Sequence, residues 1–71
     1  MPTEVEAQIT GNVWKIEKTV GERLEEEEVI LILESMKMEI PVEAPRAGRI
    51  AEIRAAEGQG VEEGDVLVLL E

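Results

Sequence analysis

Residues 29–34 read Val-Ile-Leu-Ile-Leu-Glu, and residues 66–71 read Val-Leu-Val-Leu-Leu-Glu. Each stretch is a short apolar run, rich in β-branched residues and bounded by acidic ones. This length and composition are typical of a buried strand rather than a helix. The second run begins 37 residues after the first, so the two strands point to an internal repeat.

The repeat extends over most of the chain. When residues 5–34 are aligned with residues 42–71, 11 of the 30 positions are identical, and Gly11 falls on Gly48. Two copies of one unit predict a fold with a pseudo-twofold axis rather than an open-ended solenoid.

The rest of each unit also favours strands. Apolar and charged residues mix as in half-exposed strands over Val13 to Lys18 and Ile50 to Arg54, and a further strand is expected near Ile40 to Val42. Glu22 to Glu28 has the length of a helical turn but no apolar stripe. Several short strands separated by glycine-containing turns predict an all-β fold, a small sandwich or flattened barrel.

Composition limits the possible functions. The chain has 71 residues, which predicts one domain over 1–71, and it has neither cysteine nor histidine. These absences argue against disulfide scaffolds, thiolate zinc sites and Ser–His–Asp catalysis. We therefore expect a carrier or binding module and not an enzyme with its own active site.

Charge and hydropathy bear on partners and location. The net charge of −10 predicts repulsion from nucleic acid and from anionic membranes. No apolar run approaches 18 residues and the N-terminus lacks the features of a signal peptide. We expect a free-standing cytoplasmic domain.

Four consecutive carboxylates occupy Glu25–Glu28. Such a run could form a site for a hard cation, but calcium loops space their ligands and include a turn glycine. We interpret the run as a solvated turn whose charges protect the following apolar strand from edge pairing.

The seam between the repeats lacks ordinary turn chemistry. Tight hairpins favour Asn-Gly, Asp-Gly or Gly at the tip, whereas this tip would be Met36-Lys37-Met38. The second repeat has no counterpart, since Glu71 aligns with Glu34. Either the methionines fill gaps in the core beside a solvated lysine, or the tip has a function of its own.

These residues carry a resemblance to a known family. Residues 34–39, Glu-Ser-Met-Lys-Met-Glu, resemble the attachment motif of biotin carboxyl carrier proteins, the biotinyl (biotin/lipoyl attachment) domain family, whose core is Met-Lys-Met. The resemblance extends to the surrounding segments, among them Gly11 to Ile16, Val29 to Glu34, Ala44-Pro45, Gly48, and then Gly58, Val61, Gly64 and Val66 to Leu69. It implies a flattened β-barrel of two four-stranded antiparallel sheets with quasi-twofold symmetry and the attachment lysine on a hairpin tip.

Two departures from the family pattern stand out. Glu27 occupies a position where the family usually has glycine, as the second copy has Gly64. If that turn requires a positive φ, glutamate is strained there or the turn is rebuilt. The chain also lacks the inserted thumb of some bacterial carriers, and it more closely resembles minimal attachment proteins and the terminal biotinyl domains of carboxylases.

The resemblance implies a carrier mechanism. A biotin protein ligase would join biotin covalently to Lys37, with Met36 and Met38 as its recognition flank and with Glu34 and Glu39 orienting the hairpin. Carboxybiotin would then move between a biotin carboxylase and a carboxyltransferase, as in acetyl-CoA, propionyl-CoA or pyruvate carboxylase. The chain itself would catalyse neither step.

Two other functions remain open. A lipoyl carrier of a 2-oxo acid dehydrogenase or of the glycine cleavage system would share the fold, although such carriers usually have Asp before the lysine. The chain could also be a β interaction domain whose lysine stays unmodified. Trp14, the only aromatic residue, is expected to pack in the thin core, with a contact to a carboxylase subunit as the alternative.

Overall fold

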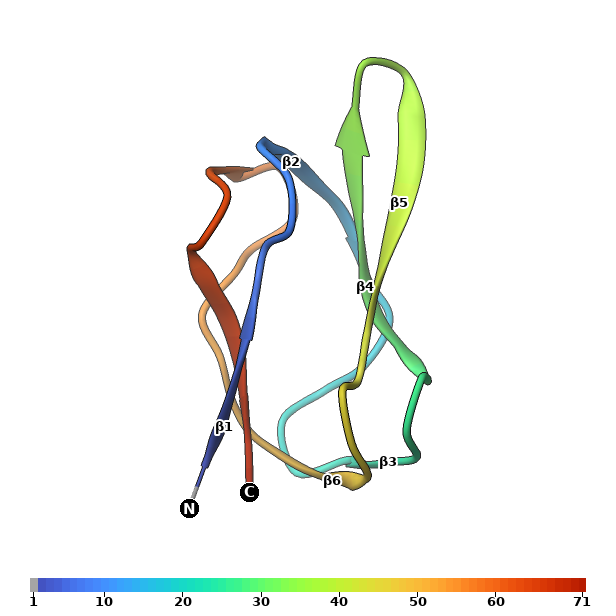
Figure 1. The fold of residues 1–71 in the computed structure, drawn as a ribbon, viewed down its shortest axis with the longest axis vertical. Coiled ribbons are helices and arrows are strands. Elements are labelled where there is room, and N and C mark those ends of the chain that lie inside the picture. The colour runs from blue at the N-terminus through green and yellow to red at the C-terminus, as the bar shows by residue number, and fades with distance from the viewer. Residues whose placement is uncertain (1) are drawn as a thin grey trace.

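The computed structural model describes residues 2–71, and this part of the chain is entirely β (Figure 1). Two four-stranded sheets form it, which confirms the expected fold class. No helix in residues 2–71 is long and apolar enough to cross a membrane. The strands are β1 (Thr3–Glu6), β2 (Gly11–Ile16), β3 (Arg23–Leu24), β4 (Val29–Ser35), β5 (Met38–Glu43), β6 (Gly48–Ile53), β7 (Gly60–Val61) and β8 (Val66–Leu70).

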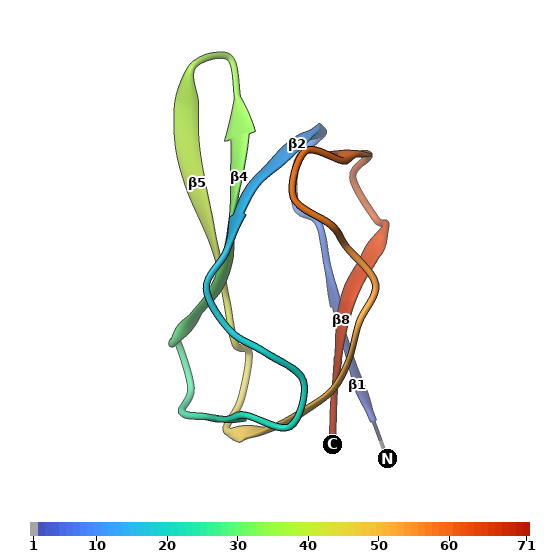
Figure 2. The ribbon, with the colours of Figure 1, turned by 180° about the vertical axis from the view of Figure 1, so that it is seen from behind.

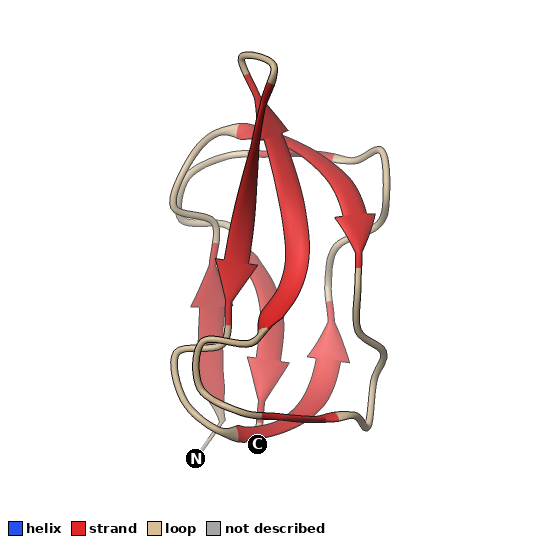
Figure 3. Cartoon of the chain, turned by 90° about the vertical axis from the view of Figure 1, so that its right-hand side faces the viewer, coloured by secondary structure: helices blue, strands red, loops and turns tan. Residues whose placement is uncertain are grey.

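Each sheet takes strands from both repeats. One sheet has the order β1-β8-β6-β3, and the other, here called the hairpin sheet, has the order β5-β4-β2-β7. All pairings are antiparallel, and Figure 3 shows the hairpin sheet lying in front of the other. The 37-residue offset converts one order into the other, so the predicted pseudo-twofold relation is confirmed.

The repeat is also visible in hydrogen bonds that extend the strand pairing within each sheet. The Ala7 amide donates to the Asp65 carbonyl over 2.8 Å, and the equivalent Ala44 amide donates to the Glu28 carbonyl over 2.9 Å. Each repeat therefore satisfies part of its backbone through the other, and the two units are interlocked rather than stacked.

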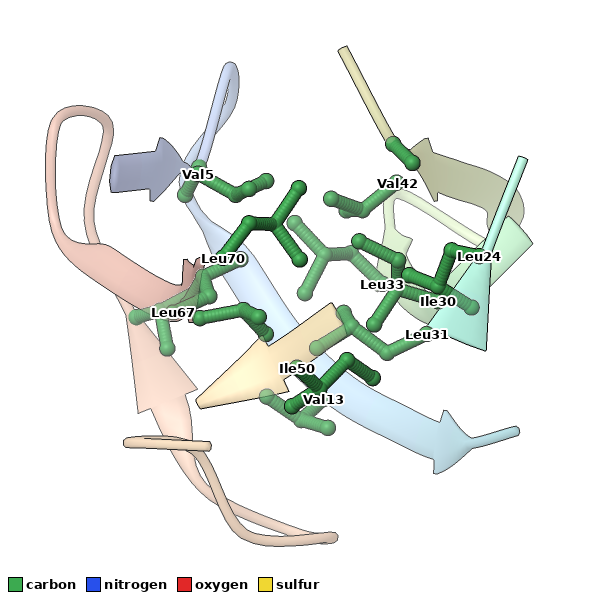
Figure 4. Close-up of a cluster of buried hydrophobic side chains, with 14 residues drawn as sticks. Val5, Val13, Leu24, Ile30, Leu31, Leu33, Val42, Ile50, Leu67 and Leu70 are labelled. Carbon is green, nitrogen blue, oxygen red and sulfur yellow. The ribbon is translucent and has the colours of Figure 1, made fainter. Parts of the chain in front are cut away.

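The core is a single layer of aliphatic side chains between the sheets (Figure 4). No polar or charged residue of the described chain is buried in it. The largest fully buried side chains are Leu24, Ile30, Leu31, Leu33, Ile50, Leu67, Leu70, Val13 and Val68. Both apolar runs contribute, as their composition predicted.

The expectation that Trp14 packs in the core is wrong. Its side chain is 48% exposed, although it belongs to β2. The cause is the alternation of the strand, because Trp14 directly follows the buried Val13 and therefore points outward. The pairing of β2 with β4 then shifts between Val13 and Lys15, and this bulge leaves Lys15 exposed as well.

Two predicted strands begin earlier than expected, at Gly11 and Gly48. A Cβ at Gly11 would lie 2.5 Å from the Glu34 carbonyl oxygen, and one at Gly48 would lie 2.7 Å from the equivalent oxygen of Glu71. Glycine therefore permits the close approach of neighbouring backbones at these two strand starts.

The acidic segment is extended and not helical, since it contains the short strand β3. Glu27 has a φ of 71°, close to the 94° of its equivalent Gly64. The turn is therefore not rebuilt, and glutamate occupies a left-handed conformation that costs an L-residue energy.

Glu28 differs from the solvated carboxylate that we expected. It accepts a hydrogen bond of 2.6 Å from Lys18 Nζ and another of 2.9 Å from the Glu25 amide. The acidic turn is therefore partly fixed by an ion pair between residues ten positions apart in the sequence.

Candidate functional site

The candidate site is the hairpin formed by β4 and β5, which projects beyond both sheets (Figures 1 and 2). β4 is flanked by β2 only as far as Glu34, which pairs with Asn12. Beyond that point the hairpin has two strands, and its last pair is Ser35 with Met38. The start of β1 and the end of β8 lie at the opposite end of the molecule from the hairpin tip.

The turn at the tip contains two residues, Met36 and Lys37, because Ser35 pairs with Met38. Their φ angles are 52° and 66°. Positive φ at both central positions is the conformation that Asn-Gly normally supplies in two-residue hairpins. The tip adopts this turn without a favourable residue, and local strain of this kind is concentrated at functional sites.

Lys37 is exposed and, within residues 2–71, takes part in none of the side-chain hydrogen bonds or ion pairs. The side chains that flank it are also exposed, Met36 by 88% and Met38 by 57%. The interpretation of these methionines as core fillers is therefore wrong. Thioether side chains are flexible and polarisable, which suits a surface read by other proteins.

Glu34 and Glu39 lie directly opposite each other across the hairpin. Both are exposed, and both alternate with the inward pair Leu33 and Ile40, so their carboxylates share the outer face. Like charges in opposite positions destabilise a sheet. The structure thus places all five predicted residues on one hairpin, with a cation at the tip and two anions just below it.

A second surface feature had no signal in the sequence. A groove of about 330 Å³ separates β1 from β5, the edge strands of the two sheets. Its rim is acidic, and none of the five predicted site residues lines it. The lining residues are Glu4, Val5, Glu6, Gln8, Ile9, Leu33, Ile40, Pro41, Val42, Glu43 and Pro45.

Comparison with known families gives a match to the family described as "Biotin-requiring enzyme" over residues 1–70. The chain is 48% identical over 40 residues to the "Biotin/lipoyl attachment protein" of Bacillus subtilis, which covers 56% of this chain and 55% of the relative. It is 41% identical over 44 residues to the "Biotinylated protein TB7.3" of Mycobacterium tuberculosis, covering 62% of each. A "Putative urea carboxylase" of Emericella nidulans is 48% identical over 42 residues, covering 59% of this chain and 3% of the relative.

Solved structures show the same architecture. The urea carboxylase of Kluyveromyces lactis matches 100% of this chain with a TM-score of 0.95 and 30% identity, over 6% of its own length. A single-chain, multi-domain long-chain acyl-CoA carboxylase matches 99% of the chain with a TM-score of 0.89 and 30% identity, over 7% of its length. The chain thus corresponds to a small part of each carboxylase and to little more than half of the small relatives.

Proposed function

The chain belongs to the biotin-requiring family as a biotin/lipoyl attachment domain, and from this premise we propose that it carries biotin covalently on Lys37. The observation that carries the proposal is the placement of one exposed lysine at the apex of a projecting, strained two-residue turn. Relatives named as biotinylated or biotin-attachment proteins support it.

The chemistry of attachment fits the residues present. An amide forms between the biotin carboxyl carbon and Lys37 Nζ when the carboxyl group is activated as an acyl adenylate, and AMP leaves as the acyl–phosphate bond breaks. The amine must lose its proton before it attacks, so the ligase has to supply both positioning and a proton acceptor. The hairpin contributes access, since no neighbouring strand flanks the last residue pair.

Met36 and Met38 are proposed as the recognition flank of Lys37. They expose apolar, adaptable side chains on both sides of the lysine without any contribution to the core. Glu34 and Glu39 are proposed to orient the hairpin, because their paired carboxylates would attract a basic ligase surface.

We further propose that the loaded domain serves a biotin-dependent carboxylase in the cytoplasm. When attached, biotin supplies a ureido nitrogen that can carry a carboxyl group between a biotin carboxylase and a carboxyltransferase. The structural similarity to parts of a urea carboxylase and an acyl-CoA carboxylase supports this class of partner. Nucleic acid and membranes are not proposed as partners, in view of the net charge of −10.

Intact mass after incubation with a biotin protein ligase, biotin and ATP tests the proposal. We expect the wild type to gain one biotinyl group and Lys37→Arg to gain none. Lys15→Arg is the matched control, because Lys15 is exposed like Lys37, with 57% of its side chain accessible, but lies on β2.

Other results would assign a different function. Modification by a lipoate ligase in place of the biotin ligase would make the chain a lipoyl carrier. If neither enzyme modified Lys37, the carrier proposal would be wrong and the unmodified interaction domain would take its place.

A further inference from the structure

The outer face of the hairpin sheet carries a row of apolar side chains. At the bulge of β2, Trp14 and Lys15 together lie opposite Ile32 of β4, and Ile32 pairs in turn with Pro41 of β5. Ile32 lies between two buried leucines of β4 and therefore points away from the core. Trp14, Ile32 and Pro41 are here called the Trp14 face.

The other sheet has an equivalent row, which shows what the fold itself requires. The 37-residue offset relates Trp14 to Ala51, which occupies the same bulge in β6. It relates Ile32 to Leu69 and Pro41 to Glu4. One aliphatic residue is kept at the centre of each row, whereas an exposed indole and a proline ring occur only in the sheet that bears Lys37. The fold therefore accommodates Ala51 and Glu4 at the positions equivalent to Trp14 and Pro41.

We propose that the Trp14 face is the docking surface for the biotin ligase that acylates Lys37, with the Trp14 indole as its anchor. This inference rests on the proposed function. The partner chemistry that fits is an apolar pocket for the indole, bordered by basic side chains.

The short distance between the Trp14 face and Lys37 supports a ligase as the protein that binds this face. Ile32 lies five residues before Lys37, which at about 3.3 Å per strand residue is on the order of 15 Å from the tip. A typical interface covers about 800 Å² on each partner, a patch roughly 30 Å across. A ligase must bring its active site to the lysine amine itself, so a footprint of this size centred on the tip reaches the Trp14 face at Ile32. A carboxylase has to reach only the far end of a long biotinyl arm, so its contact with the domain does not have to be centred on the tip.

The charges beside the Trp14 face support basic side chains around the pocket of the ligase. The paired carboxylates of Glu34 and Glu39 lie between the Trp14 face and the tip. Lys15, which lies beside Trp14 at the bulge, is paired with Glu17, its Nζ lying 3.6 Å from a Glu17 carboxylate oxygen. A buried tryptophan surrounded by weaker polar contacts is a common form of interface hot spot, and complementary charge would guide the approach.

A direct test uses the fact that Trp14 is the only tryptophan. The ¹⁵N-labelled Lys37→Arg variant cannot be acylated, and its spectrum contains one indole N–H signal. Addition of unlabelled ligase is expected to shift or broaden this signal together with the amide signals of the hairpin. Perturbation of the hairpin amides with an unchanged indole signal would overturn the docking proposal.

Kinetics give a second test. Trp14→Ala is expected to raise the KM of ligation at least about tenfold, as for an interface hot spot, and to change kcat by less than about twofold. Val20→Ala is a matched control, because Val20 is 61% exposed and lies in the loop before β3, at the end of the molecule away from the hairpin. Leu69→Ala removes the aliphatic side chain of the equivalent row in the other sheet. Both controls should keep the wild-type KM.

The outcomes separate the two proposals. A wild-type chain that gains no biotin would refute the proposed function, and the docking proposal with it. A wild-type chain that is biotinylated and a folded Trp14→Ala variant with an unchanged KM would refute the docking surface alone. A cooperative thermal unfolding transition will show whether each variant is folded. We expect Trp14→Ala to fold, because alanine already occupies the equivalent bulge position, Ala51.

Discussion

The first repeat, residues 5–34, and the second, residues 42–71, share one backbone arrangement, but their last strands lead to different structures. The last strand of the first repeat, β4, continues into the hairpin tip, whereas that of the second, β8, ends beside β1, with Leu70 opposite Thr3. The frame itself is the same, since both repeats bulge at equivalent positions and close equivalent turns.

Hydrogen bonds of the Arg46 side chain join β1 to the end of the second repeat. The Arg46 guanidinium donates to Thr3 Oγ1 over 2.7 Å and to the carbonyls of Glu71 and Leu70 over 3.0 and 3.3 Å. The 37-residue offset relates Arg46 to Ile9, an apolar residue that cannot make such bonds. One end is thus fastened by hydrogen bonds while the other projects as a hairpin. Positions where the repeats agree maintain the fold, and positions where they differ without a structural gain are candidates for function.

The largest effect is expected in the core, where the two repeats should behave alike. Leu33 and Leu70 are equivalent and fully buried, and truncation of a buried leucine costs about 2–5 kcal/mol. Leu33→Ala and Leu70→Ala should therefore lower the free energy of unfolding by similar amounts, measured by urea denaturation. A domain of this size has roughly 4–10 kcal/mol in total, so either variant will be close to unfolding. A loss below about 1 kcal/mol in only one of them would show that the halves are not mechanically equivalent.

A smaller loss is expected at the base of the hairpin. A Cβ at Gly11 would lie 2.5 Å from the Glu34 carbonyl oxygen, and overpacking against backbone costs about 1–3 kcal/mol. Gly11→Ala should therefore lower the urea midpoint and raise the KM of ligation, since the hairpin base has to move. Gly60→Ala is the control, because its Cβ would meet only Asn12 Oδ1 at 3.4 Å. Equal effects of the two substitutions would contradict this account.

The regular parts of the frame were predictable because their signal is local. The apolar runs identified β4 and β8, and the repeat identified the relation between the sheets. Resemblance to a family, not local pattern, singled out Lys37. Its modification stays a prediction, although the structure confirms that its hairpin is exposed.

The features that the sequence did not predict depend on strand pairing and on contacts between distant residues. Trp14 is outside because it follows the buried Val13 in β2, and the mixed apolar and charged residues of this segment do not indicate which of these two neighbours faces the core. The turn at Met36 and Lys37 follows from the pairing of Ser35 with Met38 and not from the preferences of its own residues. The contact between Lys18 and Glu28 joins two loops that only the folded sheets bring together.

Two strained positions allow a sharper comparison, because only one of them lies in the hairpin. Met36 and Glu27 both have positive φ, a conformation that costs L-residues about 1–2 kcal/mol. Met36→Asn and Glu27→Gly should each raise the free energy of unfolding, by up to about 1 kcal/mol, since Asn and Gly tolerate this region. Their effects on ligation should differ. Met36→Asn removes a recognition side chain and should raise the KM, whereas Glu27→Gly should leave it unchanged.

The strain account would be wrong if neither substitution raised the urea midpoint. The assignment of Met36 to recognition would be wrong if Met36→Asn were stabilised and still ligated with the wild-type KM. The second outcome would leave strain at the tip without any link to the ligase.

The smallest effect concerns an ion pair present in only one repeat. Lys18 donates to Glu28 over 2.6 Å, whereas the equivalent positions are Ala55 and Asp65. The hydrogen bond from Lys18 and that from the Glu25 amide lower the pKa of Glu28 below its ordinary 4.5. The hydrogen bond to Glu28 raises the pKa of Lys18 above 10.5.

These pKa directions fix the pH range in which the pair stabilises the fold. The contribution of Glu28 is present above the unfolded carboxyl pKa and is lost as the pH falls through the lower folded value. The contribution of Lys18 is present below pH 10.5 and is lost as the pH rises through the folded value above it. Lys18→Met keeps the aliphatic stem and removes the charge, so it should be less stable than the wild type at pH 7 and closer to it at about pH 3. Because both Lys18 and Glu28 are partly solvated, the difference at pH 7 should be small and should shrink further in high salt. A stability gap in urea denaturation that stays constant from pH 7 to pH 3 would instead assign the role of Lys18 to packing of its stem, and the two repeats would then differ here in shape rather than in charge.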